Sequence, residues 1–272
     1  SYNLSNIIKA IYGKNKKAFV LDLDNTLWGG IIGDDGVENI VLGQETAEGE
    51  AYQELHEYLK MHKDLGVILN ISSKNEEENA LLGLNSKDSI LKPEDFIVIK
   101  ANWEPKNKSV NEIAKELDLG EDSFVFVDDN PAERNIINQY NKTVVTPIIN
   151  TPDNTIKTLD RNAYFEVLKI TKEDLQKNEM YKQNSLRNKF MSSFEDYGAY
   201  LTSLNMKADI ESFIPIYMAR IAQLTNKSNQ FNLTTKRYSQ SDIEQIAEDE
   251  NYITLYGSLE DSFGDNGVVS LI

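Results

Sequence analysis

The chain has 272 residues, which is enough for one large or two modest domains, and 28 Lys and Arg against 44 Asp and Glu give it a formal net charge of −16. It has no cysteine, which excludes disulfides and thiolate zinc sites, and two histidines are too few to form a zinc site by themselves. Because the longest apolar run is four residues, the amino end does not resemble a signal peptide and the charge is strongly negative, we expect a cytoplasmic protein that binds neither membranes nor nucleic acid.

Apolar bursts alternate with amphipathic stretches between residues 16 and 147, as strands and helices do when they take turns. The expected strands are 18–23, 67–71, 96–99, 123–127 and 143–146, and the expected helices are 48–65, 75–84, 107–118 and 131–140. Asn107 is expected to cap its helix, and Pro131 to occupy the first helical position of the next one. Because the strands are apolar without alternation, they predict a parallel sheet covered on both faces, and such sheets bind ligands beyond the carboxyl ends of their strands.

The later part of the chain is more polar. Residues 148–165 predict a loop-rich connection, and 171–203 predict one or two polar helices with Ser193 as a cap. Residues 212–241, which we call the acid-free window, contain no Asp or Glu, and four basic residues give the window a charge of +4: Arg220, Lys227, Lys236 and Arg237. The window is either a solvated face or a docking surface for an anionic partner. The apolar run 268–272 is expected to be a strand in progress, as if the chain were cut within a domain.

Two carboxylates spaced i, i+2, those of Asp22 and Asp24, stand at the end of the first expected strand. Carboxylates this close raise each other's pKa unless a cation or a shared proton separates their charges. Magnesium meets this need, because it takes one or two carboxylates and also binds phosphate oxygens of a substrate. Asp22 could then attack phosphorus, and Asp24 could carry the proton of the leaving oxygen. A calcium loop is the alternative, but a strand precedes the motif and no Glu closes such a loop in register.

Further polar residues stand at other expected strand ends and helix starts. The strand 123–127 is followed by Asp128-Asp129-Asn130-Pro131, the strand 67–71 by Ser72-Ser73-Lys74-Asn75, and Lys106 precedes the helix 107–118. Each feature alone has an ordinary explanation, since acidic and Ser-Ser pairs cap helices and a lone Lys is usually solvated. Because the carboxyl ends of parallel strands share one edge, the features together predict a phosphoryl-transfer site.

The order of these motifs along the chain carries a family resemblance. Asp22-Leu23-Asp24-Asn25-Thr26, then Ser73, Lys106 and Asp128-Asp129, are similar to the four ordered motifs of the haloacid dehalogenase superfamily of phosphotransferases. Longer blocks, spread over essentially the whole chain, resemble the FkbH-like family more narrowly; they span residues 21–30, 73–75, 102–106, 124–134, 226–235 and 263–267.

The resemblance implies both an architecture and an activity. The implied fold class is α/β, with a Rossmann-like parallel sheet, a small flap and no large cap over 1–165, a helical connection over 166–203, and a partial α+β, GNAT-like domain over 204–272. The implied enzyme is a Mg²⁺-dependent glyceryl transferase and phosphatase. It takes 1,3-bisphosphoglycerate or a related glyceryl phosphate, removes phosphate, and loads the glyceryl unit on the phosphopantetheine arm of an acyl carrier protein for polyketide biosynthesis.

The family pattern also implies roles for individual residues. It makes Asp22 the phosphoryl acceptor and Asp24 the acid/base, and the implied catalytic set is Asp22, Asp24, Ser72, Ser73 and Lys106. The implied metal ligands are Asp22, Asp24, Asp128 and Asp129. The implied phosphate- or substrate-binding residues are Asn25, Thr26, Trp28, Gly29, Ser73, Lys74, Asn75 and Lys106, with Trp28-Gly29-Gly30 beginning the flap.

One position departs from the family pattern, because Ser72 stands where the family has a cysteine that can hold the glyceryl group as a thioester. A thiol is partly ionised near neutrality, whereas a serine hydroxyl needs an activating base. His56 and His62 fall on one amphipathic helix and are expected to be surface or packing residues, so neither supplies that base. Three readings remain open: an engineered replacement that blocks acyl transfer, a natural subfamily that keeps only phosphatase activity, or a serine that forms a slower oxyester.

Three functions are therefore compared. The first is the glyceryl transferase/phosphatase, the second a plain phosphatase of a small phosphorylated metabolite, and the third a non-enzymatic module that binds a carrier protein. An acidic carrier protein would need a local positive surface on this acidic chain, and the acid-free window is the long segment that offers one.

Overall fold

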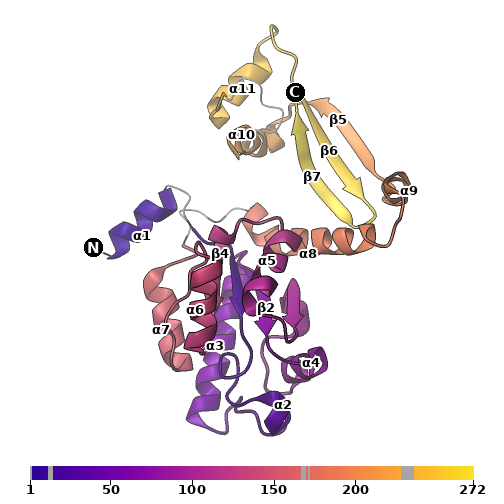
Figure 1. Ribbon diagram of the computed structural model, residues 1–272. Coiled ribbons are helices and arrows are strands. Elements are labelled where there is room, and N and C mark those ends of the chain that lie inside the picture. Colours follow the sequence, from indigo (N-terminus) through magenta and orange to yellow (C-terminus); the bar gives the residue numbers. More distant parts are fainter. Residues whose placement is uncertain (1, 12–14, 167–169, 171, 228–235) are drawn as a thin grey trace. The chain divides into compact units, whose positions relative to one another are not determined.

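The computed structural model describes residues 2–11, 15–166, 170, 172–227 and 236–272 (Figure 1). The chain divides into two compact units, Ser1–Ser185 and Leu186–Ile272. Each unit is described by itself below. In the described residues, no helix is both long enough and apolar enough to span a membrane.

The described part of the first unit is built on a parallel sheet of four strands in the order β3-β2-β1-β4. The strands are β1 (Ala18–Leu21), β2 (Ile68–Ser73), β3 (Val98–Ala101) and β4 (Phe124–Val127). Every residue of β1, β2 and β4 is buried, which is why these segments read as apolar runs without alternation. Because β1 lies between β2 and β4, the residues that follow these three strands share one edge of the sheet.

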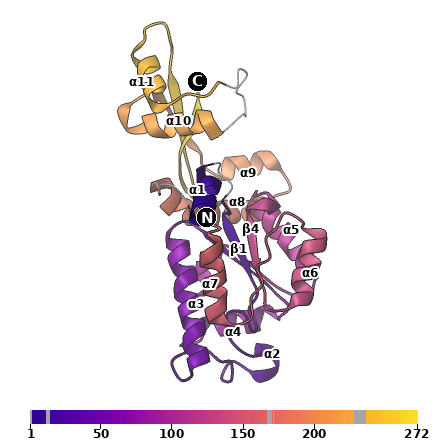
Figure 2. The ribbon, with the colours of Figure 1, turned by 90° about the vertical axis from the view of Figure 1, so that its left-hand side faces the viewer.

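Helices cover both faces of this sheet. On one face lie α3 (Ala47–Asp64), α4 (Glu77–Asn85) and α7 (Pro152–Asn162), and on the other lie α5 (Lys106–Glu116) and α6 (Pro131–Tyr140). Figure 2 shows α3 and α7 on one side of the strands and α5 and α6 on the opposite side. Alternate residues of each strand enter the two cores, so Phe19 and Leu21 pack with α3 and α7, whereas Ala18 and Val20 pack with α5 and α6. The short helix α2 (Ile32–Asp35) contacts α4, and α1 (Tyr2–Ile11) precedes the sheet.

The α/β class with a Rossmann-like parallel sheet is confirmed, and four of the five expected strands form with both ends within two residues of the expected ones. The strand expected at 143–146 is wrong. Only Val145 makes a parallel bridge, to Val125, and the run then meets Pro147, which has no N–H with which to continue a ladder. The expected cap at Asn107 is also wrong, because α5 already begins at Lys106 and Pro105 takes the N-cap position. Pro131 does begin α6.

Two expectations about the segment after the sheet are wrong as well. Residues 148–165 contain the helix α7 rather than a loop alone, with Thr151 at its N-cap and Pro152 in its first turn. That pair is a helix-start signal, because proline is pre-organised for the first helical position. Ser193 caps no helix; the expected polar helices are α8 (Lys172–Met191) and α9 (Tyr197–Ser203), and Asp196 caps α9.

The second unit combines an antiparallel sheet with helices. The strands β5 (Lys207–Ser212), β6 (Leu255–Asp261) and β7 (Gly264–Leu271) pair in the order β5-β6-β7. A small core joins the sheet to α10 (Met218–Lys227) and α11 (Gln240–Glu248) through Met218, Ile221, Ile243, Tyr256 and Val268. The division between the units falls within the expected connection 166–203, while the domain limits and the GNAT-like assignment stay predictions. Residues 228–235 of the acid-free window lie outside the described residues.

Candidate active site

A pocket of about 370 Å³ opens at the carboxyl edge of the parallel sheet. Its lining comes from the residues after β1 and β4, the end of β2, and the first turns of α5 and α6: Asp22, Asn25, Ser73, Lys74, Lys106, Asp129, Asn130, Pro131 and Glu133. Asp22 follows β1 directly, and its backbone N–H donates to the carbonyl of Val127 at 2.9 Å, so the strand pairing of β1 with β4 continues one residue into the site.

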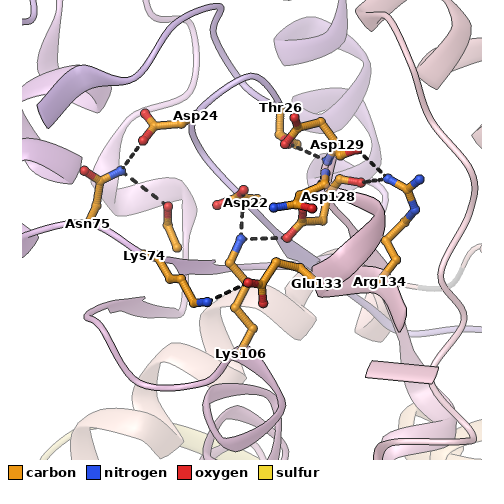
Figure 3. A network of polar contacts seen from close by, with 12 residues as sticks. Asp22, Asp24, Thr26, Lys74, Asn75, Lys106, Asp128, Asp129, Glu133 and Arg134 are labelled. Atoms are coloured by element: carbon orange, nitrogen blue, oxygen red, sulfur yellow. Dashed lines mark hydrogen bonds and ion pairs between the residues drawn. The ribbon is translucent and has the colours of Figure 1, made fainter. Parts of the chain in front are cut away.

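Lys106 is the buried cation of the site. Its Nζ lies 2.8 Å from Asp22 Oδ2 and 2.6 Å from Asp128 Oδ2. Figure 3 shows the amine between the two carboxylates. Burial alone would lower the pKa of Lys106, but the charges of Asp22 and Asp128 outweigh burial and raise the pKa above its usual value. Lys106 is therefore a permanent positive charge, and its first-turn position on α5 aims it at the strand ends.

Three carboxylates meet beside this ammonium group. Ligand atoms of Asp22, Asp128 and Asp129 lie within 4.8 Å of one another. Burial, followed by the charge of Asp22, raises the pKa of Asp128 to about 6 and raises the pKa of Asp129 as well. One ammonium group does not balance three such carboxylates, and a hard divalent cation prefers oxygen ligands of this kind. The donor set of this cluster therefore fits Mg²⁺.

The two acidic residues after β4 form a turn with fixed backbone groups. The Asp129 N–H donates to Thr26 Oγ1 at 3.2 Å, and the Asn130 N–H donates to Asp128 Oδ1 at 2.9 Å. The side chain of Asn130 then caps α6 by accepting from the Ala132 N–H. Thr26 thus supports the acidic pair from the chain segment that follows β1, without lining the pocket itself.

Asp24 faces the flap. Its Oδ1 accepts from Trp28 Nε1 at 2.9 Å and from the Ile32 N–H at 3.1 Å, and its Oδ2 accepts from Asn75 Nδ2 at 2.8 Å. Both carboxylate oxygens are therefore engaged, and Asp24 does not line the pocket. The turn between Asp24 and Trp28 is made possible by Asn25, which has φ 54°, a left-handed conformation that asparagine tolerates better than most residues.

An ion pair borders the pocket on its other side. Lys74 Nζ lies 2.6 Å from Glu133 Oε1, joining the end of β2 to the first turn of α6. Glu133 Oε2 is buried and has no hydrogen-bond partner among the described residues. Next to this pair, Ser73 lies in the pocket wall, and its Oγ is 3.5 Å from Asn75 Nδ2.

The structure brings most of the expected site residues together. Those that line the pocket are Asp22, Asn25, Ser73, Lys74, Lys106 and Asp129, and Asp128 joins them through Lys106. Three other expected residues do not line the pocket. Thr26 and Asn75 are hydrogen-bonded to the lining residues Asp129 and Ser73, and Asp24 is linked to the lining through Asn75. Trp28 and Gly29 belong to the base of the flap, where Trp28 is fully buried and Gly29 bridges to Val41.

Ser72, like Asp24, is an expected catalytic residue that does not line the pocket. Adjacent residues of a strand point to opposite faces of the sheet, so Ser73 reaches the pocket and Ser72 does not. Ser72 is fully buried, and its Oγ has no hydrogen-bond partner among the described residues. The two histidines have other partners. His56 is fully buried, and its Nε2 donates to the Leu27 carbonyl. His62 packs among Phe19, Tyr58 and Phe165.

The sequence interpretation did not assign site roles to four residues at the start of α6. Asn130, Pro131 and Glu133 line the pocket, and Arg134 holds the backbone of the acidic turn. The available signal was positional. Because Pro131 opens the helix, residues in its first turn must lie beside the end of β4 and so beside the acidic pair.

The fold and the site together define a parallel α/β domain with an acidic cluster and a buried lysine at the carboxyl edge of its sheet. No family model and no curated protein matches the chain. Among solved structures, the chain is similar to the N-terminal part of the protein BF1531 from Bacteroides fragilis, which contains a phosphatase domain and was crystallised in complex with Mg. The two share 40% sequence identity with a TM-score of 0.58, over 60% of this chain and 44% of that one. This chain thus matches less than half the length of that solved chain.

Proposed function

We propose that the chain is a Mg²⁺-dependent phosphatase in which Asp22 accepts the phosphoryl group. The observation that carries the proposal is the pocket in which Asp22, held by Lys106, faces the acidic pair Asp128–Asp129. The likeness at 40% identity to a domain described as a phosphatase complexed with Mg supports it. The buried ammonium of Lys106 holds the Asp22 carboxylate at the pocket wall, and an attacking carboxylate must be positioned in this way.

The proposed reaction has two steps on this chain's own residues. A carboxylate oxygen of Asp22 forms a bond to phosphorus while the bond from phosphorus to the leaving oxygen breaks, and Asp24 delivers a proton to that oxygen. Water then attacks phosphorus and gives a proton to Asp24 while the bond from phosphorus to the Asp22 oxygen breaks, so inorganic phosphate leaves and both carboxyl groups return to their starting states. For the first step, Asp24 must exchange its contact with Asn75 or with the flap for a contact with the leaving oxygen. Ser73 and Lys106 line the pocket, and in this proposal they hold the phosphoryl oxygens.

The cation would be held by Asp22, Asp128 and Asp129, whose ligand atoms converge. When bound there, Mg²⁺ supplies charge stabilisation for the phosphoryl oxygens as they develop negative charge.

Release of inorganic phosphate tests the proposal. The full chain is incubated with Mg²⁺ and a panel of small phosphate esters and acyl phosphates, next to the Asp22→Asn variant, which keeps the shape of the side chain and removes its charge. We expect Mg²⁺-dependent release by the parent chain and at least a hundredfold loss in the variant. Asp34→Asn, an exposed acidic residue of α2, is the matched control. Equal turnover by the parent and Asp22→Asn would contradict the assignment of the nucleophile.

The substrate and acceptor are a finer proposal, supported by the motifs that resemble the FkbH-like family. In it, 1,3-bisphosphoglycerate or a related glyceryl phosphate is the substrate, and an acyl carrier protein receives the glyceryl unit on its phosphopantetheine arm. The burial of Ser72 outside the pocket disfavours an oxyester at this residue and favours plain hydrolysis by the chain as it stands. A partial GNAT-like second domain belongs to the same finer proposal.

Mass spectrometry separates these alternatives. After incubation with 1,3-bisphosphoglycerate, Mg²⁺ and a carrier protein, a glyceryl mass on the carrier or on Ser72 supports transfer, and free phosphate alone supports the plain phosphatase. If neither the substrate nor the ester panel releases phosphate, the chain is a binding module rather than an enzyme. Ser72→Cys is the informative variant, because a gain of glyceryl mass in that variant alone would show that the hydroxyl blocks the transfer.

A further inference from the structure

Arg134 lies behind the acidic turn, in the first part of α6. Its Nη1 donates to the carbonyl oxygens of Asp128 at 2.6 Å and Asp129 at 2.7 Å, and its backbone N–H donates to the carbonyl of Asn130 at 3.2 Å. Three consecutive carbonyl groups of the turn therefore accept hydrogen bonds from one residue. Arg134 is 8% exposed and does not line the pocket, so its contacts are with the backbone of the turn rather than with a bound substrate.

These contacts fix the direction of the two carboxylates. A peptide group is planar, and its N–H points away from its C=O. The plane between Asp128 and Asp129 is held at its carbonyl by Arg134 and at its N–H by Thr26 Oγ1. The next plane is held at its carbonyl by Arg134 and at its N–H by Asp128 Oδ1. With both planes held at both ends, the side chains of the acidic pair leave the backbone in set directions, toward Asp22 (Figure 3).

These contacts oppose the electrostatic repulsion between the carboxylates of the cluster. The carboxylates of Asp22, Asp128 and Asp129 repel one another when no cation is bound, and a turn without support would relax by rotating them apart. Arginine suits this task better than lysine, because its terminal nitrogen reaches farther and offers two N–H groups in one fixed plane. Here one terminal nitrogen serves both carbonyls.

We propose that Arg134 is a positioning residue for the divalent cation. It holds the Asp128–Asp129 turn so that the carboxylates are preorganised around the cation position, and it acts on cation affinity rather than on substrate binding. The inference rests on the proposed function for the presence of the cation, and it gives a role to a residue that the sequence interpretation left without one and that does not line the pocket.

Titration calorimetry with Mg²⁺ alone tests the inference on the full chain. Arg134→Lys keeps the charge but falls short of the two carbonyls, and Arg134→Gln removes the charge. We expect both to raise the Kd for Mg²⁺ about 10- to 100-fold, as changes behind metal ligands typically do. In phosphate release, the KM for an ester should stay within about twofold of the parent value, and saturating Mg²⁺ should recover most of kcat in Arg134→Lys.

Ile137→Val is the matched control, because Ile137 is fully buried on the next turn of α6 and its side chain belongs to the apolar core beneath α5 and α6. It should lower the thermal midpoint and leave the Kd for Mg²⁺ unchanged. An unchanged Kd in folded Arg134→Lys and Arg134→Gln would overturn the inference, and so would variants that do not fold even at millimolar Mg²⁺, since Arg134 would then be a residue of the fold. If the parent chain itself binds no Mg²⁺, the proposed function fails together with the inference. If the parent binds Mg²⁺ and releases phosphate but the Kd is unchanged in the Arg134 variants, only the inference fails.

Discussion

Lys106 Nζ is shared between two carboxylates, and this sharing makes it the residue on which the site's charge balance depends most. Its side chain is 4% exposed, and those of Asp22 and Asp128 are 10% and 0% exposed. An ion pair buried to this extent is weak evidence for net stabilisation, but the removal of one partner leaves the others buried and uncompensated. Lys106 therefore links the stability of the first unit to its chemistry.

Lys106→Met is expected to lower the free energy of unfolding by about 3 kcal/mol without Mg²⁺, because Asp22 and Asp128 then repel each other in a buried site. Saturating Mg²⁺ should restore part of this stability. In contrast, kcat should stay at least about a hundredfold below the parent value, because the positive charge of Lys106 no longer stabilises the phosphoryl oxygens. Chemical denaturation and phosphate release measure the two effects. Lys108→Met is the control, since Lys108 lies on the same helix, its ion pair with Glu104 before the helix is more than half exposed, and such pairs contribute about 0–1 kcal/mol. Similar losses in both variants would contradict this account.

His56 sets a pH dependence that is separate from the site. Burial, only partly opposed by the hydrogen bond to the Leu27 carbonyl, lowers the pKa of His56 to about 4 from the usual 6.5. Both the folded and unfolded chains are neutral at this residue above pH 6.5, whereas the unfolded chain takes up a proton first as the pH falls. Stability is therefore lost between about pH 6.5 and pH 4, by about 3 kcal/mol in all for this residue.

His56→Gln isolates this contribution, because glutamine keeps an N–H for the Leu27 carbonyl and does not titrate. We expect the free energy of unfolding of the parent to fall more steeply than that of the variant between pH 7 and pH 4. The carboxylates titrate in both chains, so their contribution cancels in the difference between the two free energies. Urea denaturation at a series of pH values measures it. Parallel pH profiles would show that the folded chain takes up a proton at His56 as readily as the unfolded chain, and would contradict the lowered pKa.

At the scale of elements, the packing of α4 against the flap controls Asp24. A Cβ on Gly83 would lie 2.6 Å from Trp28 Cη2 and 3.0 Å from Ile32 Cδ1, so α4 approaches the flap more closely than any side chain at this position permits. Trp28 and Ile32 are the residues whose N–H groups hold Asp24 Oδ1. The glycine of α4 thus determines where the flap rests, and the flap determines where Asp24 points.

Gly83→Ala is therefore expected to destabilise the chain by about 1–3 kcal/mol through overpacking, although alanine in an exposed helix would stabilise it by about 1 kcal/mol. The displaced indole should also change the position of Asp24, so kcat for phosphate release should fall while the Kd for Mg²⁺ stays constant. Thermal unfolding and steady-state kinetics measure the two effects. Glu78→Ala, at an exposed position of α4, is the control for helix propensity. A more stable Gly83→Ala chain with parental kcat would show that the flap gives way freely.

At the scale of the whole molecule, periodicity was enough to predict the sheet, and the strand ends were enough to predict the acidic cluster. Parallel strands that are buried on both faces consist mostly of continuous apolar runs, so they are recognised in the sequence. Polar residues directly after such strands must lie at the carboxyl edge of the sheet. The Lys74–Glu133 pair could not be predicted this way, because its partners are 59 residues apart and meet only through the geometry of two crossovers. The orientation of Ser72 needed the register of β2, since a shift of one residue would exchange it with Ser73.

Hydrophobic periodicity also could not predict where the first unit ends, because the sequence of the polar helix α8 does not show which residues it contacts. Asn178 Nδ2 donates to the carbonyls of Lys63 at 2.7 Å and Val67 at 3.2 Å, and Ser185 Oγ donates to Glu116 at 2.6 Å. Tyr181 packs against the core beneath α5 and α6. The first part of α8 thus covers carbonyls at the end of α3 and apolar surface of the sheet domain, which argues for a folding unit that extends to Ser185 rather than to residue 165.

A fragment of residues 1–185 is accordingly expected to fold and to release phosphate at the rate of the full chain, because every residue that lines the pocket lies between Asp22 and Glu133. A fragment of residues 1–165 should have a free energy of unfolding lower by about 2–4 kcal/mol, from the lost hydrogen bonds of Asn178 and the lost burial of Tyr181. Chemical denaturation of the two fragments measures the difference, and Asn178→Ala in the longer fragment should reproduce part of it. Equal stabilities would place the limit of the unit at the sequence prediction, whereas loss of phosphate release in a folded 1–185 fragment would mean that residues 186–272 contribute to the active site.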